Sequence, residues 1–417
     1  MSENTFVSRN ITRRNLLGGL AAGAAGIAAA PVLAACGAPS TSSPPAAAAT
    51  SLGQLPSAPV TLNILDVAGN LQLTGPIITA FKQKYPNIVA KVTTSTGTAP
   101  ELAPKVQAQQ QGGNVQIQLV LTGTDGLSDG ITKGLWYDLS PYYGSFFPGL
   151  MSNYSPGAAS MATLAQNQGI ELVWYPSGPL LEYNPAKVAA PPATPDALLA
   201  WAKANPGKFQ YAQPRNSGPG RTFLMGLPYV LGDKDPQDPI HGWDKTWAFL
   251  KQLNDCIPYY PGGTSAVMKE LGEGTRDMTV TVTGWDINPR ALGIVPAEFR
   301  VQAFDNMTWV NDAHFMVIPK GVPKEKLDVI YKLMNFMLEP AQQAMTYDDG
   351  YFYPGPAIKG VSVEQAPAHS QDVLTKYGRP EYAKLLAERP HVLPLNAAAM
   401  VAAFKKWDSD VGAQKTK

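Results

Sequence analysis

The fold class is decided by the stretch Val60-Thr61-Leu62-Asn63-Ile64-Leu65, in which apolar and polar residues alternate. Such alternation predicts a half-buried β-strand. Apolar residues then recur at helical spacing between Ile77 and Tyr85, and Pro86 ends the run. The sequence therefore predicts a strand followed directly by a helix.

The same succession of strands and helices continues along the chain. Ala90 to Thr94 is a second extended run, Glu101 to Gln111 is a Gln- and Ala-rich helical stretch, and Ile117 to Leu121 predicts a third strand. Apolar strand patterns return at Gly169–Trp174, Met278–Val282 and His314–Ile318. Strands that alternate with helices favour an α/β fold with a parallel sheet covered on both faces.

Ligands of such sheets bind beyond the carboxyl ends of the strands. In this chain, the ends of the first and third predicted strands are Asp66 to Asn70 and Thr122 to Gly126. We therefore expect a binding site to form around these two segments.

The first residues have the pattern of an export signal. Thr12-Arg13-Arg14-Asn15-Leu16-Leu17 precedes an Ala- and Gly-rich apolar run, which ends at Leu33-Ala34-Ala35-Cys36-Gly37. This pattern predicts that residues 1–35 are a Tat-type lipoprotein signal peptide, with Sec export as the alternative, and that cleavage leaves Cys36 as a lipidated N-terminus. The apolar run is shorter than the ~20 residues that a membrane-spanning helix needs.

Residues 36–58 are expected to form a flexible tether, because the segment between Ala38 and Pro56 consists largely of Ala, Ser, Thr and Pro and carries no charge. A lipid on Cys36 would hold the protein on the outer face of the cytoplasmic membrane, in the periplasm or at the cell surface, without a span.

The remaining chain, residues 36–417, is long enough for two domains. The whole sequence has 33 basic and 32 acidic residues. Residues 1–35 contain three of the arginines and one glutamate, so the mature chain has a net charge of −1. This balance argues against nucleic acid as a partner. Cys256, the one cysteine beyond Cys36, is interpreted as a small core residue.

Several segments in order resemble the type II extracellular solute-binding proteins of ABC importers, in the branch that binds polyamines, iron, thiamine and phosphonates. These segments are Ile117–Thr124 with Gly130–Leu139, Glu171–Tyr175 with Tyr183-Asn184, Thr281–Trp285, Phe315–Lys320, the helical stretch Lys324–Met345 and Gly350–Pro354. The resemblance covers most of residues 60 to 360.

The resemblance implies two α/β lobes, each a mainly parallel sheet flanked by helices, which enclose a solute by hinge closure. Lobe one would comprise residues 59–174 and 312–417, and lobe two residues 175–311, with crossovers near Val173–Ser177 and Asn306–Ala313. It also implies a monomer that delivers its solute to the permease subunits of an importer, with no cofactor, no bound metal and no catalysis.

The resemblance, together with the predicted strand ends, also suggests which residues bind the solute. The candidates are Asn70, Thr122, Thr124, Asp125, Trp174, Asn216, Ser217, Arg221, Trp285, Asp286, Trp309, Asp312 and Tyr351. In the loop Pro214 to Thr222, polyamine binders place carboxylates, whereas this chain has Arg215 and Arg221. The small residues at this predicted helix start and Arg221 favour a solute with an anionic group. Alternatively, both arginines are surface residues in salt bridges.

Other functions remain open from the sequence alone. The solute could be a polyamine, with Asp66, Asp125 and Asp286 as a carboxylate set, although carboxylates at strand ends also cap helices. Tyr142-Tyr143 and Tyr259-Tyr260 are similar to the tyrosines that hold ferric ion in iron-binding relatives, but they lie elsewhere in the chain. An exported hydrolase or transferase is disfavoured because the four histidines are scattered and no catalytic motif occurs.

Overall fold

The computed structural model describes residues 56, 58–412, 415 and 416. The predicted signal peptide, Cys36 and nearly all of the predicted tether lie outside these residues. Within the described ranges, no helix has both the length and the apolar character needed to cross a membrane.

The first of two sheets has the strand order β10-β4-β9-β3-β1-β2, with β11 paired to β9. Its strands are β1 (Val60–Asp66), β2 (Val89–Thr96), β3 (Leu119–Gly123), β4 (Ile170–Gly178), β9 (Trp309–Val317), β10 (Gly355–Pro356) and β11 (His391–Val392). β1 pairs in parallel with β2 and β3, whereas β9 is antiparallel to β3 and β4.

The second sheet has the order β6-β7-β5-β8. Its strands are β5 (Leu180–Tyr183), β6 (Phe209–Gln210), β7 (Met278–Thr281) and β8 (Arg300–Gln302). β5 is antiparallel to β7 and β8, and β6 is parallel to β7. The predicted α/β fold with two sheets is confirmed. The expectation that each sheet is mainly parallel is wrong for the second sheet, because two of its three strand pairings are antiparallel.

Helices connect and cover these strands. They are α1 (Leu71–Lys84), α2 (Ala99–Gln111), α3 (Thr124–Thr132), α4 (Tyr143–Phe146), α5 (Leu150–Asn153), α6 (Pro156–Ala162), α7 (Pro195–Ala204), α8 (Gly218–Leu231), α9 (Asp244–Asn254), α10 (Thr264–Gly272), α11 (Thr283–Ala291), α12 (Lys324–Met337), α13 (Pro340–Ala344), α14 (Ala368–Tyr377), α15 (Pro380–Glu388) and α16 (Ala397–Trp407).

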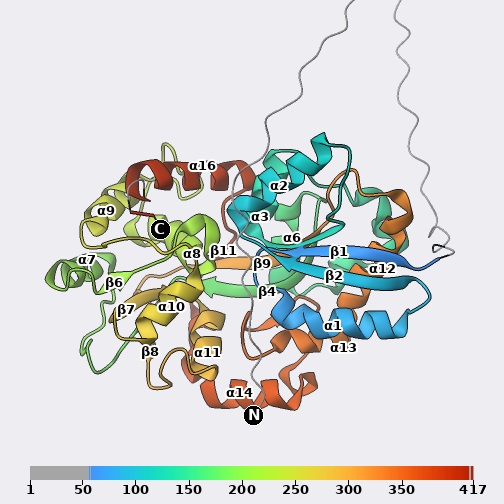
Figure 1. Ribbon diagram of the computed structural model, residues 1–417. Helices are drawn as coiled ribbons and strands as arrows, with labels where there is room; N and C mark the ends of the chain where they lie inside the picture. The colour runs from blue at the N-terminus through green and yellow to red at the C-terminus, as the bar shows by residue number, and fades with distance from the viewer. Residues whose placement is uncertain (1–55, 57, 413–414, 417) are drawn as a thin grey trace, which may run out of the picture. The chain divides into compact units, whose positions relative to one another are not determined.

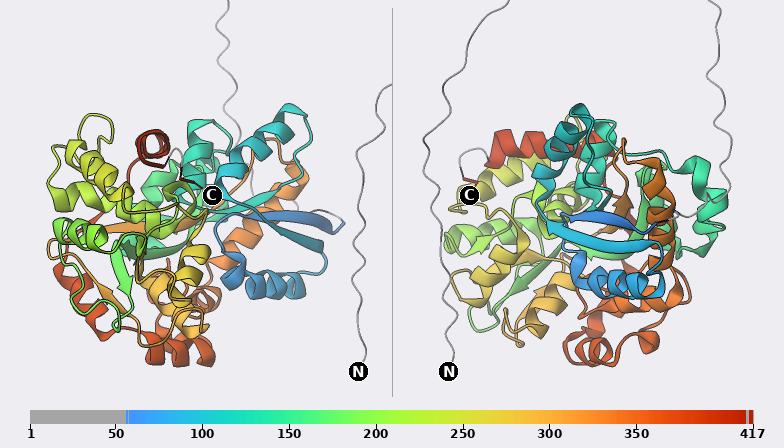
Figure 2. Two further views of the ribbon diagram at one scale, coloured as in Figure 1. Left: turned by 60° about the vertical axis from the view of Figure 1, so that its left-hand side comes forward. Right: turned by 45° about the vertical axis from the view of Figure 1, so that its right-hand side comes forward.

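The alternation in β1 divides its side chains between the two faces of the first sheet. Leu62 and Ile64 are buried in a cluster with apolar residues of α1 and α12, whereas Leu65 is buried in a cluster with residues of α2. Figures 1 and 2 show α1 and α2 on opposite sides of β1 and β2. The period-two pattern of the sequence thus produces a sheet that is covered on both faces.

The chain passes between the two sheets along strands β4 and β9. β4 belongs to the first sheet and leads through Pro179 into β5 of the second sheet, and the return runs from β8 into β9. In Figure 1, β4 and β9 lie between the region of β1 and β2 and the region of β6, β7 and β8. The segments expected as crossovers, Val173–Ser177 and Asn306–Ala313, lie in or beside these two strands. Their role as hinges between two lobes stays a prediction.

The C-terminal part of the chain packs with the second sheet. Val373 of α14, Tyr382 of α15 and Trp407 of α16 are buried in the same apolar cluster as Leu181 of β5. Helix α16 also contacts α3, the helix that follows β3 of the first sheet. The division of residues 312–417 between the lobes, like the other domain boundaries, stays a prediction.

Two predicted elements have different bounds in the structure. The helix expected from Lys324 to Met345 is divided into α12 and α13, because Glu339 before Pro340 adopts an extended backbone. The strand expected to begin at His314 begins at Trp309, because β11 extends the pairing at that end.

Candidate functional site

A cavity of about 290 Å³ lies where segments from both sheets meet. From the first sheet it is lined by residues at and just after the ends of three strands: Asp66–Gly69 at β1, Thr96–Thr98 at β2, and Gly123 with Asp125 at β3. Opposite them lie Asn216–Gly218 and Arg221 of α8 and its preceding turn, Gly263–Ser265 at the start of α10, and Trp285 of α11. The cavity therefore occupies the carboxyl-end position expected for ligands of α/β sheets.

Four helices begin with their N-cap residue in this cavity wall. These N-cap residues are Thr98 of α2, Gly123 of α3, Ser217 of α8 and Gly263 of α10. The positive ends of the four helix dipoles thus point toward a common space. Ser217 accepts a hydrogen bond from Gly220 N, whereas Gly263 offers no side-chain cap to α10.

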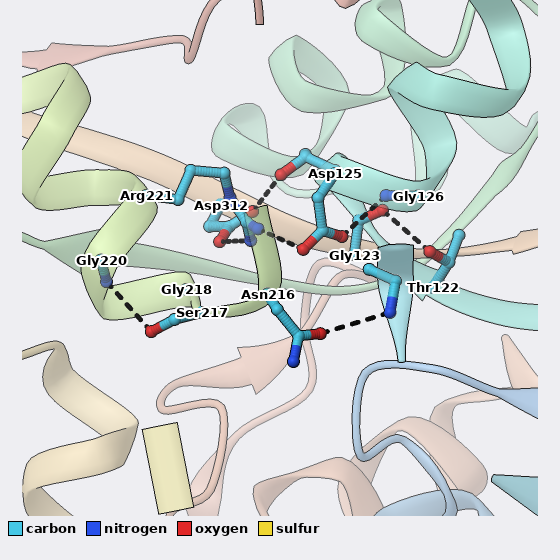
Figure 3. Close-up of polar contacts among 12 residues, drawn as sticks. Thr122, Gly123, Asp125, Gly126, Asn216, Ser217, Gly218, Gly220, Arg221 and Asp312 are labelled. Carbon is cyan, nitrogen blue, oxygen red and sulfur yellow. Dashed lines mark hydrogen bonds and ion pairs between the residues drawn. The ribbon is translucent and has the colours of Figure 1, made fainter. Parts of the chain in front are cut away.

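Arg221 forms the main ionic contact across the cavity wall. Its two terminal nitrogens donate to Asp125 Oδ2 at 2.6 Å and to Asp312 Oδ2 at 2.5 Å. Figure 3 shows the guanidinium between these two carboxylates. Only 2% of Arg221 is exposed. Arg221 lies on α8, which follows β6 of the second sheet, whereas Asp125 and Asp312 lie on α3 and β9. The two ion pairs of Arg221 therefore link the two sides of the cavity.

Two hydroxyl groups beside Arg221 hold Asp312 in place. Asp312 Oδ1 accepts a hydrogen bond from the Thr124 hydroxyl at 2.7 Å, and its Oδ2 accepts one from the Tyr175 hydroxyl at 3.1 Å. Burial alone would lower the pKa of Arg221, but the carboxylates of Asp312 and Asp125 raise it above its usual value, so the guanidinium stays charged. Burial raises the pKa of Asp125, an effect that Arg221 opposes.

The turn before α8 is fixed by close packing and by one contact across the cavity. A Cβ atom on Gly220 would lie 2.3 Å from the backbone oxygen of Ala212, so only glycine fits there. Asn216 Oδ1 accepts a hydrogen bond from Ala99 N of α2 at 3.2 Å. Arg215 instead pairs with Asp408 at 2.8 Å and does not line the cavity.

Aromatic side chains form another wall of the cavity. The rings of Trp285 and Tyr351 meet edge to face with centroids 5.3 Å apart, and Tyr351 lies 4.3 Å from Phe352. The ring of Phe352 stacks on Tyr175 at 5.5 Å. This contact of α11 with the 350–352 segment requires Gly284, because a Cβ there would lie 1.9 Å from the Tyr351 backbone oxygen.

Six of the candidate binding residues line the cavity. They are Asp125, Asn216, Ser217, Arg221, Trp285 and Tyr351. Asp312 does not line it but contacts Arg221, and Thr124 contacts Asp312. Asn70 lies behind the cavity wall, where its side chain bridges Asp66 and His314.

Besides Asp312, Thr124 and Asn70, four further candidates do not line the cavity. Asp286 is fully buried between Arg290 and Arg379, and accepts a further hydrogen bond from the Tyr382 hydroxyl at 2.7 Å. Trp309 is fully buried in the cluster of the second sheet, and donates to Leu385 O at 3.1 Å. Trp174 packs over Gly157, and Thr122 is buried at the end of β3. These side chains contribute to the interior instead.

One tyrosine of each pair packs against other aromatic rings, whereas Tyr259 donates a hydrogen bond to Glu270. Tyr142 packs on Tyr331 at 4.9 Å, and Tyr260 packs on Trp407 at 4.8 Å. Within the described part of the chain, no group of three or more His, Cys, Asp or Glu side chains is arranged to hold a metal ion. Cys256 is buried, as expected for a core residue.

Several lining residues were not among the candidates. They include Thr96–Thr98, Tyr175, Gly263–Ser265, His314 and Phe352. Asp66, which also lines the cavity, was expected at the end of the first strand and in the alternative carboxylate set. Gly262-Gly263-Thr264-Ser265 before an apolar helical pattern was a detectable signal for a helix start. His314 had no such signal. Burial lowers its pKa to about 3, so the ring is neutral at physiological pH.

Comparisons with solved structures reveal proteins with a similar fold. A putative spermidine/putrescine ABC transporter from Listeria monocytogenes is 17% identical, with a TM-score of 0.58 over 84% of this chain and 99% of that chain. The periplasmic binding protein AfuA from Actinobacillus pleuropneumoniae, solved with exogenous fructose-6-phosphate bound, is 16% identical, with a TM-score of 0.59 over 84% and 98%. A periplasmic thiamin binding protein is 15% identical, with a TM-score of 0.59 over 85% and 96%.

A comparison with curated protein sequences finds no match. Residues 76–375, which contain most of both sheets and most of the cavity lining, match the family described as bacterial extracellular solute-binding protein. This match covers well over half of the chain, and its description is that of a binding protein and not of an enzyme. The chain belongs to the bacterial extracellular solute-binding protein family.

Proposed function

We propose that this protein is the solute-binding component of an ABC importer, which captures a small organic solute between its two lobes and delivers it to the permease subunits. The observation that carries this proposal is the cavity between the strand ends of the first sheet and helices α8, α10 and α11. A solute in this position contacts both sides, so its binding energy favours a closed arrangement.

We further propose that the solute carries an anionic group. The starts of α8 and α10 face the cavity, and the N-cap of α10 leaves the first-turn amides of that helix without a side-chain partner. Backbone amides at a helix start favour an anion. In this structure both terminal nitrogens of Arg221 already bind carboxylates, and the Thr264 hydroxyl shares a hydrogen bond with Ser217. We therefore assign the anionic group to the backbone amides at the start of α10 and to the Ser265 hydroxyl.

The protein is proposed to be exported through a Tat-type signal, lipidated at Cys36 and held as a monomer at the outer face of the cytoplasmic membrane. The support for this is the sequence: the paired arginines, the small residues before Cys36 and the uncharged segment that follows.

Native mass spectrometry of the protein purified after export tests the function. We expect one small molecule per chain that is retained under native conditions and lost on unfolding. Adding the identified molecule back at a hundredfold excess over its dissociation constant should raise the stability by ~2.7 kcal/mol without product formation. Turnover of the molecule, or a complete lack of stabilisation by any metabolite fraction, would contradict a receptor function.

A further inference from the structure

Asp66 is a buried carboxylate in the cavity wall that forms no ion pair with any described cationic side chain. Only 2% of the residue is exposed. Its oxygens accept hydrogen bonds from Ala68 N at 2.9 Å, Leu71 N at 2.8 Å and the Asn70 amide at 3.4 Å. All three donors are neutral, so no cationic side chain of the described chain neutralises Asp66, and only amide groups and the start of α1 offset its charge. Burying a charge without a partner of opposite sign is costly.

The charged residues around the cavity give it an excess of negative charge. Among the described residues that line it, Arg221 is the only one with a permanent positive charge, and Arg221 is bound to Asp125 and Asp312. His314 also faces the cavity, but it is neutral because burial lowers its pKa to about 3. The three carboxylates therefore outnumber the one cation at this site.

Aromatic rings surround the same end of the cavity as Asp66. The Tyr351 hydroxyl lies against Gly69, 2.3 Å from where a Cβ of that residue would stand, and Trp285 packs against Tyr351. Burial and the charge of Asp66 both raise the pKa of Tyr351, as expected for a ring near this carboxylate. A carboxylate beside tryptophan and tyrosine rings is a favourable environment for an organic cation.

We infer that Asp66 binds a cationic group of the solute, which is held against Trp285 and Tyr351. The inference rests on the proposed function and makes it more specific. With an anionic group at the start of α10 and a cationic group at Asp66, the solute class is a zwitterion with an ammonium-type group. Asp66 also caps the start of α1 through Ala68 and Leu71, and the experiment must separate this structural role from binding.

The experiment uses small cations as probes, so it does not require the natural solute. Saturation-transfer NMR measures binding of methylammonium and tetramethylammonium to the protein at constant ionic strength, with tert-butanol as the neutral probe. We expect transfer to at least one cation and much less to tert-butanol. Asp66→Asn, which retains one oxygen acceptor, should weaken cation binding about ten- to hundredfold.

Asp233→Asn is the matched control. Asp233 also caps a helix, accepting from Lys245 N at 2.8 Å and Thr246 N at 3.0 Å of α9, but it does not line the cavity. This variant should bind the cations as the unmodified protein does. If Asp66→Asn fails to fold, Trp285→Leu removes the aromatic face and should also weaken cation binding.

The inference is overturned if neither cation binds, if tert-butanol binds equally well, or if Asp66→Asn and Asp233→Asn behave alike. None of these results would affect the proposed receptor function, because that function is tested by the retained solute and by stabilisation. Conversely, cation binding that depends on Asp66 would support this site even before the natural solute is known.

Discussion

Arg221 at the start of α8 donates a hydrogen bond of 2.6 Å to Asp125 at the start of α3, so two helices on opposite sides of the cavity are joined by a buried ion pair. The same guanidinium reaches Asp312 on β9. The positive charge of Arg221 is therefore paired with two carboxylates of the protein itself. Arg221 therefore both links the two sides and determines how much negative charge the cavity presents.

Arg221→Met should destabilise the protein by ~3–5 kcal/mol, because it leaves Asp125 and Asp312 buried without their cationic partner. Urea unfolding at pH 7 measures the change. Arg215→Met is the control, since the pair of Arg215 with Asp408 is partly exposed and should contribute only ~0–1 kcal/mol. Equal losses for the two variants would show that the Arg221 cluster contributes no more than a surface pair.

Gly220→Ala should destabilise the protein by ~1–3 kcal/mol, because the new methyl group overlaps the backbone oxygen of Ala212 and displaces the start of α8. Thermal and urea unfolding give the value. Gly75→Ala in α1 is the matched control, since no atom lies within 4 Å of the added Cβ. There the substitution should stabilise the helix by ~0.5–1 kcal/mol. Opposite signs for the two glycines are the expected outcome.

Glu171 on β4 should make the stability depend on pH. Glu171 is fully buried, and neither of its carboxyl oxygens has a hydrogen-bond partner in the described structure. Burial raises the pKa of this carboxyl group well above its usual value. Since the folded state holds the proton more tightly than the unfolded state, this contribution is present below about pH 4.5 and is lost as the pH rises toward the folded pKa.

The corresponding measurement is urea unfolding of the unmodified protein and Glu171→Gln between pH 4.5 and pH 8. The stability of the variant relative to the unmodified protein should increase as the pH rises above 4.5, by at most about 1.4 kcal/mol per pH unit, and level off once the pH passes the pKa of Glu171 in the folded state. Glu298→Gln at an exposed loop position should show no such trend. A difference between Glu171→Gln and the unmodified protein that stays constant with pH would mean that Glu171 is not protonated in the fold.

Cys36→Ala should abolish lipidation and release the protein from the membrane fraction after export, because the cysteine thiol is the proposed site of lipid attachment. Detergent phase partitioning and metabolic labelling with a fatty-acid analogue measure both effects. Cys256→Ala is the control and should leave the partitioning unchanged, since Cys256 is buried in the folded chain. Unchanged partitioning of Cys36→Ala would refute the proposed anchor.

Local patterns were sufficient to predict the five longer strands of the first sheet, but not the two-residue strands β10 and β11. The alternation in residues 60–65 and the helical spacing that follows correspond to β1 and α1, because burial on one face imposes a period that can be read directly along the chain. The ends of β1 and β3 were likewise predicted to meet at a site, since parallel strands present their carboxyl ends at one edge. Asp66 and Asp125 do lie there.

Tertiary structure alone decided what these side chains contact. Arg221 is 96 residues from Asp125 and 91 from Asp312 in the sequence. The helical and strand periodicities of a sequence do not predict ion pairs over such separations. From the sequence, Asp286 was as good a candidate for a carboxylate at a strand end as Asp66. In the structure, however, its side chain on α11 pairs with Arg290 and Arg379. The sequence by itself determined the elements, the family and the edge where a site forms, because these depend on local burial patterns. Long-range packing decides which carboxylate pairs with a cation of the protein and which is left for a solute. Only the tertiary structure shows this packing.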